Sequence, residues 1–222
     1  MSPSSRESKI RGISKSLRNI KLTLEYDGTD FNGWQIQAKG QRTVQGEIES
    51  ALKKIFPPHR TADRIKLYGS GRTDAGVHAL GQIANFKTHT ILKTEVLRKA
   101  LNANLPPDIV IVRVEDVPLN FHAQYSAKSK IYRYTILNRD SRPAYARQLC
   151  LHFPYQLNLK LLRQEARVLV GRKDFRSFGS LDKGQSRENT IRHVKKILSQ
   201  KNRNFASPPA PAQGLTLLEV KF

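Results

Sequence analysis

Apolar and polar residues alternate from Ile20 to Tyr26, and the alternation stops at Asp27-Gly28, a pattern that predicts a β-strand running into a turn. The next apolar positions, spread over residues 44–55, follow Thr43 at the spacing of one helical face. They predict an amphipathic helix. The chain is therefore expected to begin with a strand, a turn that is a candidate for function, and a helix.

The later apolar runs continue this mixture of elements. Further strands are expected over residues 64–68, 81–87, 109–114, 125–138 and 190–198, and further helices over 96–101 and 159–169. Such a mixture is typical of an α+β protein with a mainly antiparallel sheet. We expect two related ferredoxin-like α/β halves, residues 20–117 and 118–222, preceded by a basic, disordered arm over residues 1–19.

The charge of the chain points to a polyanionic partner. There are 39 Lys and Arg residues against 18 Asp and Glu residues, which gives a formal net charge of +21. Nucleic acid is the leading candidate, because contacts between phosphates and Lys or Arg supply most of the non-specific affinity of proteins for it. The alternative is a basic surface with no binding role, which we regard as the minority interpretation at this magnitude.

Compartment and cofactor chemistry are limited by what the sequence lacks. Cys150 is the only cysteine, so an intrachain disulfide and a cysteine-based zinc site are excluded and a reducing compartment fits. No apolar run approaches the roughly 20 residues of a membrane span. We expect a cytoplasmic protein, although the basic, Ser-rich start of the chain is also compatible with an organellar transit peptide or an RNA-binding arm.

The segment Leu67–His78 is the strongest candidate for catalysis. It places Asp74 and Arg72 among three glycines directly after an apolar run. Glycine allows positive φ and close approach of the backbone, so such a loop can present a carboxylate and a guanidinium to a bulky ligand. Taken alone, a segment rich in Gly, Ser and Asp is more often an ordinary turn, and the rest of the chain has to decide.

Four blocks of the sequence share their residues, order and spacing with a known family. They are Tyr26-Asp27-Gly28-Thr29 with Phe31 and Gly33-Trp34-Gln35; Gly71-Arg72-Thr73-Asp74-Ala75-Gly76-Val77-His78; Leu101-Asn102-Ala103-Asn104-Leu105-Pro106; and Phe121-His122-Ala123 with Tyr132-Arg133-Tyr134. Through these blocks the chain resembles the tRNA pseudouridine synthase A family. The resemblance runs from about residue 20 to residue 197 and returns at residues 210–215, so it covers nearly the whole chain.

The resemblance implies a pseudouridine synthase fold and the conversion of uridine to pseudouridine in the tRNA anticodon stem-loop, at tRNA positions 38, 39 and 40. It implies no cofactor, no metal and a symmetric homodimer that holds tRNA. Asp74 would be the catalytic aspartate, acting as nucleophile or as base at the ribose. Arg72 would enter the RNA stack and hold the target nucleotide flipped out.

Tyr132 would stack on the target base by the same resemblance, as aromatic rings do in many RNA-binding proteins. The alternative for Tyr132 is packing in the core, because Tyr134 follows at alternate spacing on the same expected strand. Arg72 likewise has an ordinary alternative as a surface arginine. Periodicity alone favours the core for Tyr132, and the resemblance reverses that preference.

Three other residues near the expected site have less specific interpretations. Trp34 and Gln35 fall in a loop, where they either shape the wall of the site or, for the aromatic ring, close the core. His78 follows Asp74 by four residues, but no second metal-ligating residue stands at a suitable spacing. A structural histidine is the favoured interpretation.

One departure from the family pattern affects the expected activity. Family members carry a helix with a Phe-x-x-x-Met-Val-Arg-Asn sequence before the terminal Ala-Pro-x-Gln-Gly segment, whereas this chain passes from Phe205 directly to Ala206, and its single methionine is Met1. That helix would bring an arginine to the catalytic aspartate. Either the sequence lacks a stretch that the full protein carries, or the protein lacks it and is impaired. A noncatalytic RNA-binding or tRNA-folding protein on the same scaffold is therefore the alternative function.

Overall fold

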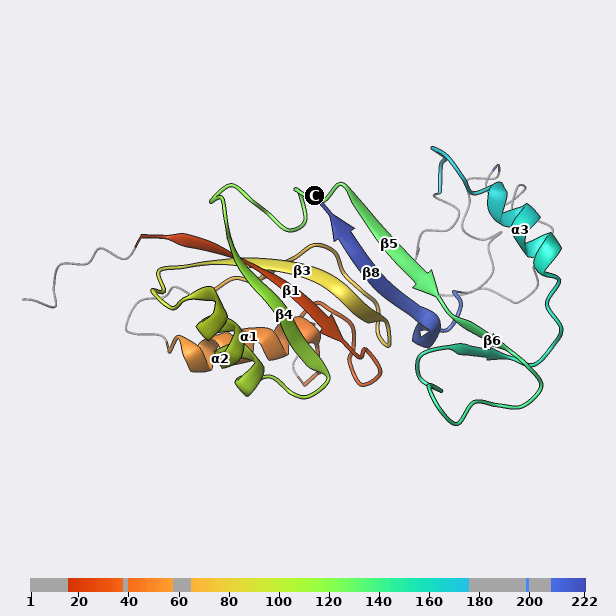
Figure 1. Ribbon diagram of the computed structural model, residues 1–222, viewed down its shortest axis with the longest axis horizontal. Helices are drawn as coiled ribbons and strands as arrows, with labels where there is room; N and C mark the ends of the chain where they lie inside the picture. The colour runs from red at the N-terminus through yellow and green to blue at the C-terminus, as the bar shows by residue number, and fades with distance from the viewer. Residues whose placement is uncertain (1–15, 38–39, 58–64, 176–198, 200–208) are drawn as a thin grey trace, which may run out of the picture. The chain divides into compact units, whose positions relative to one another are not determined.

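The structure is a computed structural model, and it describes residues 16–37, 40–57, 65–175, 199 and 209–222 (Figure 1). The chain divides into two compact units. The first unit contains the described residues up to Thr135 together with residues 148–150 and 212–222, and the second unit contains residues 136–147 and the described residues from 151 to 211. Each unit is described by itself below.

A six-stranded sheet organises the first unit. Its strands are β1 (Arg18–Tyr26), β2 (Tyr68–Gly69), β3 (His78–Thr88), β4 (Ile109–Val117), β5 (Ser129–Tyr134) and β8 (Leu215–Lys221). They lie in the order β4-β1-β3-β8-β5, with β2 also paired to β3. Only the β3–β8 pair is parallel among these pairs. The expectation of an α+β protein with a mainly antiparallel sheet is confirmed.

Two helices pack on one face of this sheet, α1 (Val44–Ile55) and α2 (Thr94–Asn104) (Figure 1). Helix α1 begins where the sequence predicts, because the Thr43 hydroxyl accepts a hydrogen bond from the Gly46 N–H group at 3.3 Å and so caps the helix.

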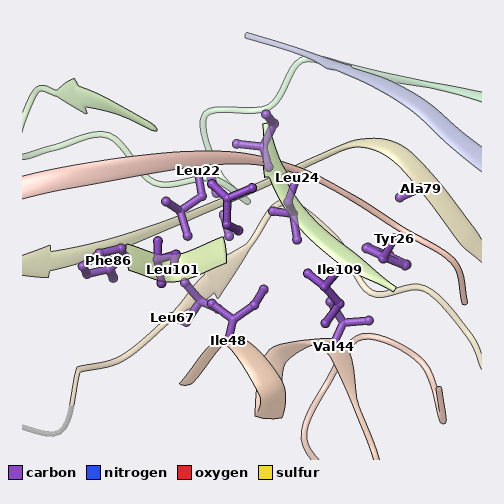
Figure 2. Packing of buried hydrophobic residues seen from close by; sticks show 14 of the residues in the cluster. Leu22, Leu24, Tyr26, Val44, Ile48, Leu67, Ala79, Phe86, Leu101 and Ile109 are labelled. Atoms are coloured by element: carbon purple, nitrogen blue, oxygen red, sulfur yellow. The ribbon is translucent and has the colours of Figure 1, made fainter. Parts of the chain in front are cut away.

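The core lies between the sheet and the helices, as Figure 2 shows for Leu22, Leu24, Ile48 and Leu101. These four side chains are fully buried. Burying a side chain of this size stabilises the fold by about 1.5–3 kcal/mol. The apolar faces of β1 and α1 thus hold the sheet and the helix together, and the neighbouring loops project from these two elements.

Between residues 136 and 167, the second unit forms a short parallel pair of strands and a helix. Strand β6 (Ile136–Asn138) pairs with β7 (Leu151–Phe153), and α3 (Leu159–Arg167) follows. The Asn158 side chain caps α3 by accepting the Leu161 N–H group at 3.0 Å. This helix confirms the one expected over residues 159–169, and it ends two residues earlier.

The structure differs from the expected elements in four places. The strand expected over residues 64–68 is found, among the described residues, only at Tyr68–Gly69, and β7 and β8 are strands that the periodicity did not predict. The long strand expected over residues 125–138 is instead β5 and β6, interrupted where the Thr135 N–H group donates to the Gly214 carbonyl at 2.8 Å.

The sheet of the first unit includes strands from both sides of residue 117, so the two units do not coincide with the expected halves, residues 20–117 and 118–222. The division into two related halves stays a prediction. The strand expected over residues 190–198, the junction between Phe205 and Ala206, and most of the expected arm over residues 1–19 lie outside the described residues.

Candidate active site

The glycine-rich loop joins β2 to β3, as the sequence predicts, and its start is fixed by a buried polar pair. The Ser70 hydroxyl donates to Gln82 Oε1 at 2.6 Å, and Gln82 Nε2 donates to the Gly71 carbonyl at 3.0 Å. Ser70 and Gln82 are both fully buried. Because buried polar groups are costly to leave unpaired, these bonds hold the loop in one path as it leaves the sheet.

The centre of the loop is held by Thr73, the residue directly before Asp74. The Thr73 carbonyl accepts the Trp34 N–H group at 3.0 Å. The Thr73 hydroxyl lies 2.8 Å from the hydroxyl of Tyr26, a buried residue at the end of β1. Gly33 has φ of +87°, and a Cβ there would lie only 2.5 Å from the Thr73 carbonyl oxygen. The turn after β1 therefore packs directly on the Asp74 loop.

His78, at the end of the loop, is buried and bonded to neighbouring segments of the first unit. Its ring is buried, and Nδ1 accepts the Gly28 N–H group at 3.0 Å. Nε2 lies 2.9 Å from the Gln148 carbonyl oxygen, and Asp27 Oδ1 lies 3.1 Å from Nδ1. The ring thus joins three segments of the first unit, which agrees with the interpretation of His78 as structural.

Asp74 and Arg72 line the same pocket, which has a volume of about 410 Å³. Both residues are exposed. The other lining residues are Asn32, Gln35, Gln37, Gln41, Thr73 and Ala75. Side-chain amides both donate and accept hydrogen bonds, so the pocket combines one carboxylate and one guanidinium with groups suited to the polar edges of a nucleobase.

Tyr132 on β5 stands close enough to this pocket to respond to the charge of Asp74. Burial and then the negative charge of Asp74 raise the pKa of Tyr132. The ring is 45% exposed, so the alternative of a core tyrosine is wrong. Pairing across the sheet aligns Tyr26 with Ala79, Ala79 with Leu217, and Leu217 with Tyr132, which places both tyrosines in one row.

A second cation lies against the loop from the same strand. A Cβ on Gly71 would come within 2.4 Å of Lys130 Nζ, so the amino group of this exposed lysine rests on the loop backbone. Arg72 and Lys130 therefore both place positive charge at the loop that carries Asp74. Positive charge in this position suits a polyanionic ligand.

Trp34 and Gln35 take the two roles left open for them. Trp34 is 3% exposed, and its ring centroid lies 6.3 Å from that of Tyr26, so it closes the core. Gln35 lines the pocket. Sequence reasoning missed Asn32, Gln37 and Gln41, and the only signal for them was the frequency of amide residues in this loop.

The described residues meet neither the requirements of a metal site nor those of a membrane-spanning helix. No cluster of three or more His, Cys, Asp or Glu residues suited to a metal ion is present within it. Among the helices that the structure describes, none is long and apolar enough to cross a membrane.

Comparison with known proteins agrees with the fold and the loop. A family model described as tRNA pseudouridine synthase matches residues 23–126, which include the Asp74 loop. The chain is 43% identical over 206 residues to tRNA pseudouridine synthase A of Thermoanaerobacter pseudethanolicus, covering 93% of this chain and 81% of that relative. It is 47% identical over 178 residues to the protein of the same name from Caldicellulosiruptor saccharolyticus, covering 80% and 70% respectively.

The mixed, mainly antiparallel sheet with its helices is consistent with the pseudouridine synthase fold. At these identities and coverages the chain belongs to the tRNA pseudouridine synthase family, whose enzymes are isomerases.

Proposed function

We propose that this chain isomerises uridine to pseudouridine in the anticodon stem-loop of tRNA, at positions 38, 39 and 40, with Asp74 as the catalytic carboxylate. The observation that carries the proposal is the pocket in which Asp74 and Arg72 lie together among amide side chains. Membership of the family supports the substrate class. The net charge of +21 supports a nucleic acid of this size as the ligand.

A single carboxylate is enough for this reaction, which needs no cofactor. The bond from ribose C1′ to uracil N1 breaks, a bond from C1′ to C5 forms, and the proton lost from C5 is balanced by one gained at N1. No electrons are gained or lost overall. Asp74 serves either as the nucleophile at C1′ or as a base at the ribose, and both roles require its ionised form.

Arg72 and Tyr132 are proposed to hold the target nucleotide. The planar guanidinium of Arg72 suits stacking on bases and pairing with phosphate, and it lines the same pocket as Asp74. Tyr132 is half-exposed and within the electrostatic reach of Asp74, so its ring is available to stack on the flipped base. Following the family resemblance, we also propose that the protein is cytoplasmic and that it forms a homodimer. Light scattering of the purified chain would test the homodimer.

The test is the mapping of pseudouridine in an unmodified tRNA transcript after incubation with the chain. We expect product at positions 38, 39 and 40, and none at a position where uridine is replaced by cytidine. Asp74→Ala should lower the rate at least 100-fold, while Asp30→Ala, which removes an exposed aspartate from the neighbouring turn, should leave it within about twofold. Tight tRNA binding without product from the unaltered chain would support the noncatalytic alternative.

A further inference from the structure

A cluster of aromatic rings, tilted against one another by 51° and 32°, stands on the first unit outside the Asp74 pocket. The ring centroids of Tyr68 and His122 are 4.7 Å apart, and those of His122 and Tyr125 are 4.4 Å apart. Lys66 places its Nζ 5.2 Å from the Tyr68 ring centroid. Tyr125, at the outer end, is 80% exposed. We call Tyr68, His122, Tyr125 and Lys66 the aromatic platform.

A buried amide network builds this platform. Tyr68 is paired with Asn85 across the β2–β3 ladder, and Asn85 Oδ1 accepts the Ala123 N–H group at 2.8 Å. Asn85 Nδ2 in turn donates to Asn19 Oδ1 at 2.9 Å. Asn85 is 2% exposed and Asn19 is 1% exposed. Asn85 therefore links the two parts of the platform: its backbone belongs to the strand paired with that of Tyr68, and its buried side chain holds the loop that carries His122.

Local hydrogen bonds also fix the turn that presents Tyr125. The Gln124 N–H group donates to His122 Nδ1 at 3.2 Å, and the Ser126 N–H group donates to the His122 carbonyl at 2.8 Å. The His122 N–H group donates back to Ser126 Oγ at 3.1 Å. Because the turn is already ordered, a ligand that stacks on Tyr125 does not have to order this segment.

We propose that Tyr125, supported by His122 and Tyr68, stacks on an unpaired nucleotide of the bound tRNA outside the Asp74 pocket, and that Lys66 contacts a nearby phosphate. This inference rests on the proposed function. An aromatic face and an adjacent cation are the two features by which proteins bind unpaired nucleotides. The charge of +21 favours RNA over a protein partner as the occupant.

The chain limits how far this nucleotide lies from the target uridine. Tyr68 precedes Asp74 by six residues, so their Cα atoms are at most about 20 Å apart. Successive bases of one strand are about 3.4 Å apart in a helical stack. Allowing for the rings beyond Tyr68, the platform lies within roughly ten stacked nucleotides of the target. We expect the contact in the same stem-loop, which fits within this distance.

The first test compares the affinities of variants for an unmodified tRNA transcript in an Asp74→Ala background, which prevents conversion of the substrate. Tyr125→Ala should weaken binding roughly 5-fold to 150-fold, the range for loss of one base–aromatic stack. Tyr125→Phe keeps the ring and should bind within twofold of the background protein. Ile91→Ala, at a site that is 71% exposed, is the control for loss of an exposed apolar side chain.

Salt dependence separates stacking from charge. Lys66→Ala should reduce the slope of log affinity against log salt concentration by about one, whereas Tyr125→Ala should leave that slope unchanged. Circular dichroism of each variant checks that it is folded.

The second test uses transcripts that carry a single abasic nucleotide at each position of the anticodon stem-loop in turn. At one position, the loss of affinity seen with Tyr125 present should disappear in Tyr125→Ala, because the base and the ring then have no stack left to lose. The proposed stacking on Tyr125 would be overturned by unchanged affinity in Tyr125→Ala. It would also be overturned if at no position the effect of the abasic nucleotide depends on Tyr125. Those results leave pseudouridine formation by the unaltered chain intact, so they are distinguishable from failure of the proposed function.

Discussion

Removal of one hydroxyl group, in Tyr26→Phe, should separate the stability of the fold from the placement of the catalytic loop. The Tyr26 hydroxyl lies 2.8 Å from the Thr73 hydroxyl, and the two residues are 4% and 8% exposed. The substitution keeps the ring that packs near Trp34 and leaves the Thr73 hydroxyl buried without this partner. Leaving a buried polar group unpaired costs about 1–3 kcal/mol, so the free energy of unfolding should fall by that amount.

The substitution should also slow the reaction, because Thr73 directly precedes Asp74. A displacement of a catalytic group by about 1 Å costs on the order of 100-fold in rate. We expect the single-turnover rate of pseudouridine formation at saturating tRNA to fall about 10-fold to 100-fold, with tRNA affinity changed much less. Urea unfolding of the same preparations gives the stability, and Tyr155→Phe, at an exposed tyrosine, is the matched control.

Adding Thr73→Val to Tyr26→Phe separates the cost of an unpaired hydroxyl from the loss of the hydrogen bond. In Tyr26→Phe with Thr73→Val, both hydroxyls are absent, so the double variant should regain part of the stability that Tyr26→Phe loses. Its rate should stay low, because the hydrogen bond between residues 26 and 73 is still missing. If Tyr26→Phe loses stability but keeps the full single-turnover rate, the hydrogen bond does not position Asp74 and this account of the loop is wrong.

Three further predictions concern the stability of the fold. Gly28→Ala should prevent native folding, seen as loss of the cooperative unfolding transition, because a Cβ there would lie 2.0 Å from the Val77 carbonyl oxygen; a normal transition would contradict this. Burial raises the pKa of Tyr26 to about 12, so the contribution of Tyr26 to stability should be constant below about pH 10, the unfolded pKa, and be lost as pH rises toward 12; Tyr26→Phe should show a smaller fall in stability over this range than the unaltered chain. Asp116→Asn should lower the free energy of urea unfolding at pH 7 by only about 0.2–1 kcal/mol, because Asp116 pairs with Arg18 at 2.7 Å but its side chain is 53% exposed; a loss above 2 kcal/mol would contradict a surface pair.

The elements that the sequence predicted correctly are those with local signals. Strand β1 alternates from Ile20 to Tyr26, and α1 combines a regular apolar face with a capping threonine. Strand β8 was missed, although its apolar residues Leu215, Leu217 and Val220 contribute to the sheet. Its partners are β3 and β5, which are far away in the sequence, and periodicity within one segment does not report such pairings.

The same distinction applies to the candidate site. Asp74 and Arg72 share a pocket largely because they are two residues apart in one loop, so their proximity could be predicted. Asn32 and Gln41 reach the pocket from another loop, which the hydrogen bond between Trp34 and Thr73 places there. A bond between distant segments leaves no pattern in either segment. Whether Tyr132 faces the core or the solvent depended on the neighbours of β5, which only the structure shows.

The most direct test of the central claim is the single-turnover rate of pseudouridine formation at saturating tRNA for the unaltered chain, Asp74→Asn and Asp30→Asn. Asp74→Asn keeps the shape of the side chain and removes only its charge and basicity. We expect the unaltered chain and Asp30→Asn to form pseudouridine at similar rates and Asp74→Asn to form none above background while still binding tRNA. Product from Asp74→Asn at the unaltered rate would contradict the assignment of Asp74 as the catalytic carboxylate.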